Sequence, residues 1–156
     1  MRLAICAVGR LRAGSERALV DDYLARVDRT GRALGLGPAT VTEVDDRKGG
    51  GKAAEAQLIS RALPEGARLC VLDERGKTLS SPGFADLLAR WRDEGQGTAA
   101  FVIGGADGLD PALVARADAT LSFGPMVWPH MLARVMLAEQ LYRATAILAG
   151  TPYHRV

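Results

Sequence analysis

The chain has 156 residues, a length typical of one domain with a single hydrophobic core. Hydrophobic residues make up 48% and charged residues 24%, and no apolar run approaches the ~20 residues that a membrane helix needs. The N-terminal segment also lacks the hydrophobic stretch of a secretory signal. We therefore expect one domain over residues 1–156, located in the cytoplasm and without a membrane partner. The net charge of +2 does not by itself indicate nucleic-acid binding, so any RNA contact must come from local clusters.

The first half of the chain alternates strand-like and helix-like segments. Residues 3–8 (LAICAV) predict a buried strand. Ser15 is expected to cap a helix over residues 15–34, which Gly35 ends. Within that helix, a four-residue spacing is typical of a core-facing stripe at Leu19, Tyr23 and Val27. The elements predicted next are a strand over 40–44, a charged glycine-rich loop over 45–52 and a helix over 53–63.

The second half continues the same alternation and ends in the longest helix. Ser81 with Pro82, and Asp110 with Pro111, have the residue types of a helix N-cap followed by the first helical position. Strands are predicted over 68–73, 98–103 and 119–123, and helices over 81–94, from 110 onward and over 131–148. Five strands separated by helices imply an α/β fold with a mostly parallel sheet, flanked by helices on both faces. Such sheets bind ligands beyond the carboxyl ends of their strands.

Two irregular segments follow strands at that edge. Gly104, Gly105 and Gly108 lie in the turn 103–109 (IGGADGL), which lacks the spacing of a dinucleotide fingerprint and is either a ligand-binding turn or an ordinary tight turn. Residues 121–129 (LSFGPMVWP) hold two prolines and several apolar side chains. An adenine ring or a partner subunit would cover those side chains, unless the loop folds back onto its own core.

The segment from Gly49 to Lys52 resembles a phosphate-binding loop only superficially. A Walker motif needs a glycine where Asp46 stands and a serine or threonine where Ala53 stands, so nucleotide hydrolysis is excluded. The basic residues of this loop are instead expected to be mobile and to touch RNA; they are Arg47, Lys48 and Lys52.

Polar residues at the two ends of the last helix are further candidates. His130 and Arg134 are four residues apart at a helix N-terminus, so they share a face and form either an anion site or a solvated helix start. The tail Tyr153, His154 and Arg155 either frays or supplies stacking and charge to RNA. The helix between them has an apolar surface that is broad for one sheet face and indicates either a central helix or a subunit interface; its stripe is Leu132, Val135, Met136 and Tyr142.

The cysteines and histidines do not indicate a metal site. Cys6 and Cys70 lie in apolar strand-like runs, which favours small buried side chains over a disulfide or a reactive thiol. No spacing of cysteine and histidine fits a zinc site, and we expect no metal.

Several segments together resemble one known family. VLDERGK, FVIGGADGL, LSFGPMVWPHMLARVMLAEQLYRA and the terminal PYHR occur in an order and spacing similar to the ribosomal RNA large subunit methyltransferase H family, in the SPOUT class. The resemblance spans essentially the whole chain. It implies a C-terminal trefoil knot, a homodimer, and S-adenosylmethionine as the cofactor. It also implies methylation at N3 of a pseudouridine, pseudouridine1915 of 23S rRNA, within the ribosome.

The same resemblance implies site residues. The positions that match the cofactor contacts are Leu72, Gly104, Phe123, Gly124, Pro125, Met126, Val127 and Trp128. Those that match the catalytic, substrate-facing positions are His130, Arg134, Tyr153, His154 and Arg155. The imide N3 must lose its proton to attack, so Arg134 or Arg155 is a candidate for favouring the anionic base. His130 or His154 is a candidate for accepting the proton.

Other readings remain open from the sequence. A non-catalytic ribosome-binding module with this fold would lack cofactor binding. A SPOUT methyltransferase acting on tRNA or on a ribose oxygen would differ only in its substrate. A nucleotide-dependent oxidoreductase is disfavoured, because the dinucleotide fingerprint is missing.

Overall fold

A computed structural model describes residues 1–45, 47 and 49–155 of the chain. Asp46 and Lys48 of the basic loop, and Val156 of the tail, lie outside the described residues. Within the described residues a single sheet has five strands in the order β2-β1-β4-β3-β5, and every neighbouring pair is parallel. The strands are β1 (Arg2–Val8), β2 (Ala39–Val44), β3 (Arg68–Thr78), β4 (Thr98–Ile103) and β5 (Ala119–Ser122). The predicted parallel α/β sheet is confirmed.

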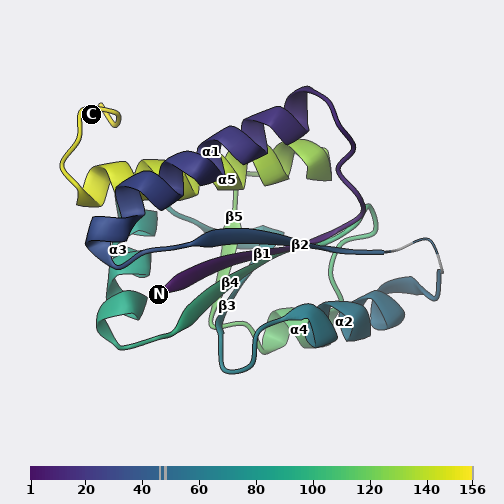
Figure 1. The fold of residues 1–156 in the computed structure, drawn as a ribbon. Coiled ribbons are helices and arrows are strands. Elements are labelled where there is room, and N and C mark those ends of the chain that lie inside the picture. The colour runs from purple at the N-terminus through teal and green to yellow at the C-terminus, as the bar shows by residue number, and fades with distance from the viewer. Residues whose placement is uncertain (46, 48, 156) are drawn as a thin grey trace.

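Helices cover both faces of this sheet (Figure 1). The helices are α1 (Ser15–Gly31), continued by the 3-10 helix η1 (Arg32–Leu34), α2 (Gly51–Ala62), α3 (Ser81–Asp93), α4 (Pro111–Ala115) and α5 (His130–Leu148). Helices α1, α3 and α5 pack on one face, and α2 and α4 on the other. None of the helices in the described part of the chain combines the length and the hydropathy needed to cross a membrane.

The central strands β1 and β4 supply the core on both sides of the sheet. Leu3 and Ile5 of β1 point toward α1, α3 and α5, and Cys6 points to the other layer, as expected from the alternation of a strand. Phe101 of β4 is fully buried and contacts the edge of Phe84, with ring centroids 5.9 Å apart. Burial confirms the prediction for both cysteines and raises the pKa of Cys6 to about 11.

Two features of helix α1 differ from the prediction. Ser15 is the first helical residue, whereas Gly14 occupies the cap position without a side-chain hydrogen bond. Leu19 is 45% exposed and the adjacent Val20 is buried instead, whereas Val27 is buried as predicted. The buried stripe consists of Val20, Leu24, Val27 and Gly31. Tyr23 is half-buried at the edge of this stripe.

The elements of the second half need smaller corrections. Ser80, not Ser81, caps α3 by accepting a hydrogen bond from the Gly83 amide, so Pro82 lies at the second helical position. Asp110 caps α4 as predicted. In α5 the predicted stripe is only partly buried and Leu132 is 39% exposed. The buried side chains of α5 include Leu137 and Leu141, which adjoin the predicted stripe, and the small Ala138 and Ala144, which let neighbouring helices approach closely.

Strand β3 is longer than predicted and irregular. It continues beyond Asp73 to Thr78, and its pairing with β5 is broken between Leu72 and Lys77. Gly76 lies in this break, where a Cβ would come within 3.0 Å of the Leu121 backbone. Because of this irregularity, both Leu72 and Lys77 pair with Leu121 of β5, and the residues between them bulge out beside the end of β5.

Candidate active site

A cavity of about 290 Å³ lies at the carboxyl edge of the sheet. It is bordered by the second half of β3, by the segments that follow β4 and β5, and by the first turns of α2 and α5. Its volume is near the lower end of the ~300–1,000 Å³ typical of small-molecule sites. The parallel topology therefore creates the ligand position that the sequence predicts.

Most of the predicted cofactor residues meet in this cavity. The lining includes Leu72, Gly104, Phe123, Gly124, Met126, Val127 and Trp128, and the exposed Pro125 is not part of it. His130, predicted on the substrate side, also lines the cavity. Residues from three strand ends are thus neighbours although they are up to 56 positions apart, from Leu72 to Trp128. Their contact with a cofactor stays a prediction.

Hydrogen bonds hold the wall after β5 in place. The Ser122 hydroxyl donates to the Glu74 carbonyl at 3.0 Å and accepts from the Gly124 amide at 3.1 Å. Gly124 has φ of +103°, a backbone conformation that other residues rarely adopt. Ser122 therefore connects the second half of β3 to the segment after β5. Sequence reasoning missed this residue, because serine at a strand end is too common to be a signal.

Close packing forms the wall after β4. A Cβ at Gly104 would come within 2.9 Å of the Leu109 side chain, so only glycine fits without a shift. The neighbouring Gly105 amide donates to a carboxylate oxygen of Glu55 on α2 at 3.2 Å. The turn is therefore fixed from both sides, which keeps its backbone close to the cavity.

The cavity combines an apolar floor with charged edges. The apolar side chains include Leu72, Ile103, Leu109, Leu121 and Phe123. The charged residues that sequence reasoning did not select are Asp73, Glu74, Arg75 and Asp107, although they lie within the segments VLDERGK and FVIGGADGL that carry the family resemblance. An apolar floor suits a purine ring, and carboxylates suit hydroxyl and ammonium groups. The side chains that line the cavity therefore fit a positively charged nucleoside such as S-adenosylmethionine.

Among the described residues, no cluster of three or more histidine, cysteine, aspartate or glutamate side chains has the arrangement of a metal site.

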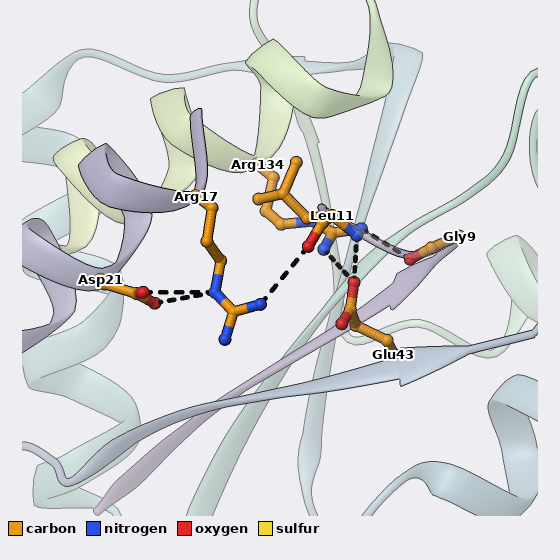
Figure 2. Close-up of polar contacts among 6 residues, drawn as sticks. All are labelled: Gly9, Leu11, Arg17, Asp21, Glu43 and Arg134. Atoms are coloured by element: carbon orange, nitrogen blue, oxygen red, sulfur yellow. Dashed lines mark hydrogen bonds and ion pairs between the residues drawn. The ribbon is translucent and has the colours of Figure 1, made fainter. Parts of the chain in front are cut away.

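His130 and Arg134 occupy different environments despite their helical spacing. His130 is exposed at the cavity. The Arg134 side chain is 3% exposed and forms a 2.9 Å ion pair with Glu43 at the end of β2. It also donates to the Gly9 carbonyl at 3.1 Å (Figure 2). The structure thus brings His130, and not Arg134, to the cavity.

Glu43 is held in its charged form. Burial, the largest single effect, opposes ionisation. Hydrogen bonds from the Leu11 amide and from Arg134 together outweigh burial, so the pKa of Glu43 lies below its usual range. A buried guanidinium and a partly exposed carboxylate therefore join β2 to the start of α5.

The C-terminal tail is docked at the opposite end of α5. The Tyr153 hydroxyl donates to Glu139 at 2.9 Å, and its ring lies 4.6 Å from that of Tyr142. Arg143 lies over the Tyr153 ring, and its Nη1 atom is 3.3 Å from Nδ1 of His154. Burial, followed by hydrogen bonding to Glu139, raises the pKa of Tyr153. The described tail is therefore packed on the helix, and Arg155 is exposed beyond it.

The five predicted catalytic residues do not form one cluster within a single chain. His130 begins α5 and the tail follows its end, and an α-helix of 19 residues is about 28 Å long. The two ends of α5 are well separated in the ribbon, with the tail beyond the far end (Figure 1). One copy of the chain therefore presents His130 and the tail at different ends of the same helix.

Together, the parallel sheet and the cavity at its carboxyl edge define an α/β protein built to hold a small nucleoside-like ligand. Residues 1–154 match the family described as predicted SPOUT methyltransferase. The chain belongs to this family of methyltransferases, whose members use S-adenosylmethionine.

Curated relatives match the full length. The chain is 74% identical to the ribosomal RNA large subunit methyltransferase H of Dinoroseobacter shibae over 156 residues, covering all of both chains. It is 69% identical to the protein of that name from Ruegeria pomeroyi, again covering all of both chains. The family expected from the sequence is thereby confirmed.

Solved structures of low sequence identity share the fold. One is a probable methyltransferase from Bordetella pertussis Tohama I, with a TM-score of 0.52 and 18% identity over 92% of this chain and 96% of the other. Another is a probable methylase family protein from Haemophilus influenzae Rd KW20, with a TM-score of 0.51 and 13% identity over 99% of this chain and 70% of the other.

Proposed function

We propose that this chain transfers a methyl group from S-adenosylmethionine to a base of ribosomal RNA, at N3 of pseudouridine1915 in 23S rRNA. The observation that carries the proposal is the cavity shared by the ends of β3, β4 and β5, with His130 at its rim. The names of the full-length relatives support the choice of RNA as substrate.

In this proposal the residues that line the cavity bind and orient S-adenosylmethionine. When bound, S-adenosylmethionine supplies a methyl group on a sulfonium, which the attacking nitrogen takes as the carbon–sulfur bond breaks. Leu72, Phe123 and the backbone around Gly104 would hold the adenosine part in the apolar floor. The protein then gains rate mainly by aligning nucleophile, methyl carbon and sulfur, which is a positional effect.

The substrate side needs a base and a cation near N3 of the pseudouridine. The exposure of His130 at the rim supports it as the group that would accept the N3 proton. Arg134 is enclosed and already paired with Glu43, which favours the exposed Arg155 as the cation that stabilises the anionic base. His154 and Tyr153 would orient the base beside Arg155. In this scheme Arg134 acts through the position of α5 and does not touch the substrate.

A second copy of the chain completes the site in this proposal. Because about 28 Å of helix separates His130 from its own tail, the tail that reaches the base belongs to the partner in a homodimer. Exposed apolar side chains beside the cavity support such a contact: Met126 is 72%, Val127 83%, Trp128 42% and Met131 42% exposed. The trefoil knot, the single domain over residues 1–156 and the cytoplasmic location belong to the same proposal.

The decisive experiment uses ribosomes that lack the modification. The purified protein is incubated with them and with S-adenosylmethionine labelled in its methyl group, and the labelled nucleotide is mapped. We expect label at one pseudouridine of 23S rRNA. Label in tRNA alone, or on a ribose oxygen, refutes the proposed substrate. Calorimetry without a heat of S-adenosylmethionine binding favours a non-catalytic ribosome-binding module.

A further inference from the structure

A second cleft lies beside the methyl-donor cavity. It has a volume of about 750 Å³ and lies at the carboxyl ends of β1 and β2. Four arginines line it, against two carboxylates: Arg10, Arg12, Arg17 and Arg47, with Glu43 and Asp45. The cleft therefore carries an excess of positive charge, although the overall charge of the chain is nearly balanced.

Internal ion pairs account for some of these charges but not for all. Arg17 pairs with Asp21 at 3.2 Å and donates to the Leu11 carbonyl (Figure 2). Arg47 pairs with Asp45 at 2.6 Å. Within the residues that the structure describes, exposed Arg10 and Arg12 form no ion pair or hydrogen bond, which leaves both guanidinium groups available to an external anion.

Side chains of Glu43 and Arg134 form hydrogen bonds with the backbone next to Arg10 and Arg12. Glu43 accepts a hydrogen bond from the Leu11 amide, and Arg134 donates to the Gly9 carbonyl at 3.1 Å. The 2.9 Å ion pair between Glu43 and Arg134 closes this network. A loop fixed in this way presents its arginines without a large entropic cost on binding, because the loop is already ordered.

The cleft and the methyl-donor cavity meet at one point. Gly9 lines the cleft and His130 lines the cavity. A Cβ built on Gly9 would be 4.0 Å from Nε2 of His130, so the two residues are neighbours. An extended polymer with one unit at His130 would therefore place adjoining units over the cleft.

We propose that the cleft binds the phosphodiester backbone of the substrate RNA next to the methylated base, through Arg10 and Arg12. The inference rests on the proposed function for its choice of polymer. Arginine forms paired hydrogen bonds to phosphate oxygens, and such contacts position RNA without reading its sequence. The net charge of the chain is small, so RNA binding is expected to come from a local cluster of basic residues, and the proposal assigns it to this cleft.

The test compares two double variants of the full-length protein. R10Q/R12Q removes two charges from the cleft, and the matched control R61Q/R90Q removes two from exposed positions of α2 and α3. Affinity for protein-free 23S rRNA is measured between 50 and 200 mM salt. Each lost phosphate contact lowers the slope of log affinity against log salt by about 0.7–0.9, so the wild type and the control should lose about 10-fold more affinity across this range than R10Q/R12Q.

Two further readouts keep the proposal open to refutation. R10Q/R12Q should bind S-adenosylmethionine like the wild type and should raise KM for the ribosome more than it lowers kcat. A salt slope equal to that of R61Q/R90Q overturns the proposal. Weaker binding to ribosomes with unchanged binding to protein-free rRNA assigns the cleft to an acidic protein partner and also overturns it. A wild type that binds rRNA through the cleft but methylates none refutes only the proposed function.

Discussion

Removing one partner of the ion pair between Glu43 and Arg134 should destabilise the fold strongly. The change E43Q keeps an acceptor for the Leu11 amide but leaves the Arg134 charge, in a side chain that is 3% exposed, without its counter-ion. Breaking a buried pair costs about 3–5 kcal/mol, and because the Glu43 side chain is 31% exposed we expect about 2–3 kcal/mol. For a chain of this size, the melting temperature should fall by about 5–10 °C.

Differential scanning calorimetry on the wild type and E43Q measures this effect. The matched control is D21N, which breaks the Arg17–Asp21 pair, whose side chains are 51% and 62% exposed. An exposed pair contributes about 0.5 kcal/mol or less, so D21N should lower the melting temperature by about 2 °C at most. Equal shifts for E43Q and D21N would refute the burial argument. The double change E43L/R134M should recover only part of the loss, because it removes both charges together but also the partners of the Leu11 amide and the Gly9 carbonyl.

Three other outcomes follow from the site and the core. The pKa of Glu43 is lowered in the folded state, so its contribution to folding stability is present above about pH 4.3 and is lost as the pH falls through the folded pKa. Urea unfolding midpoints should therefore drop more steeply below about pH 4.3 in the wild type than in E43Q. Burial raises the pKa of Cys6 to about 11 and of Cys70 to about 12, so folding stability should fall as the pH rises above about 8.5, and a thiol reagent that labels the native protein quickly would contradict this. Deleting residues 153–156 should leave the calorimetric affinity for S-adenosylmethionine unchanged and abolish methyl transfer to ribosomes, and a truncated protein that still methylates would make the tail dispensable.

Hydrophobic patterning predicted the sheet well, because local signals and the tertiary structure agree there. Strand β4 matches its predicted bounds, since six consecutive residues from Thr98 to Ile103 are bordered by glycine on each side. The convergence of the strand ends followed from the parallel arrangement alone. The buried Val27 of helix α1 was predicted correctly, but Leu19 was expected in the core where Val20 is buried, because both are apolar and spacing cannot rank them.

The candidate site was less accessible to sequence reasoning because its contacts join distant residues. Helical spacing put Arg134 beside His130, yet its partner is Glu43, 91 positions earlier in the chain. No periodicity connects a strand end to a helix that far away. The docking of Tyr153 on Glu139 likewise depends on the path of the chain after α5. The break in β3 at Gly76, which shapes the cavity wall, has no local pattern.

The length of α5 makes the activity of the proposed enzyme depend on protein concentration, because the proposed site needs two copies of the chain. Helix α5 separates His130 from Tyr153 in one molecule, so under the proposed scheme a single copy would keep its cavity for the methyl donor but would not catalyse methyl transfer. Specific activity should consequently decline on dilution, while the donor affinity of each chain stays constant. Two inactive variants, one changed at His130 and the other lacking its tail, should regain turnover when their subunits are exchanged.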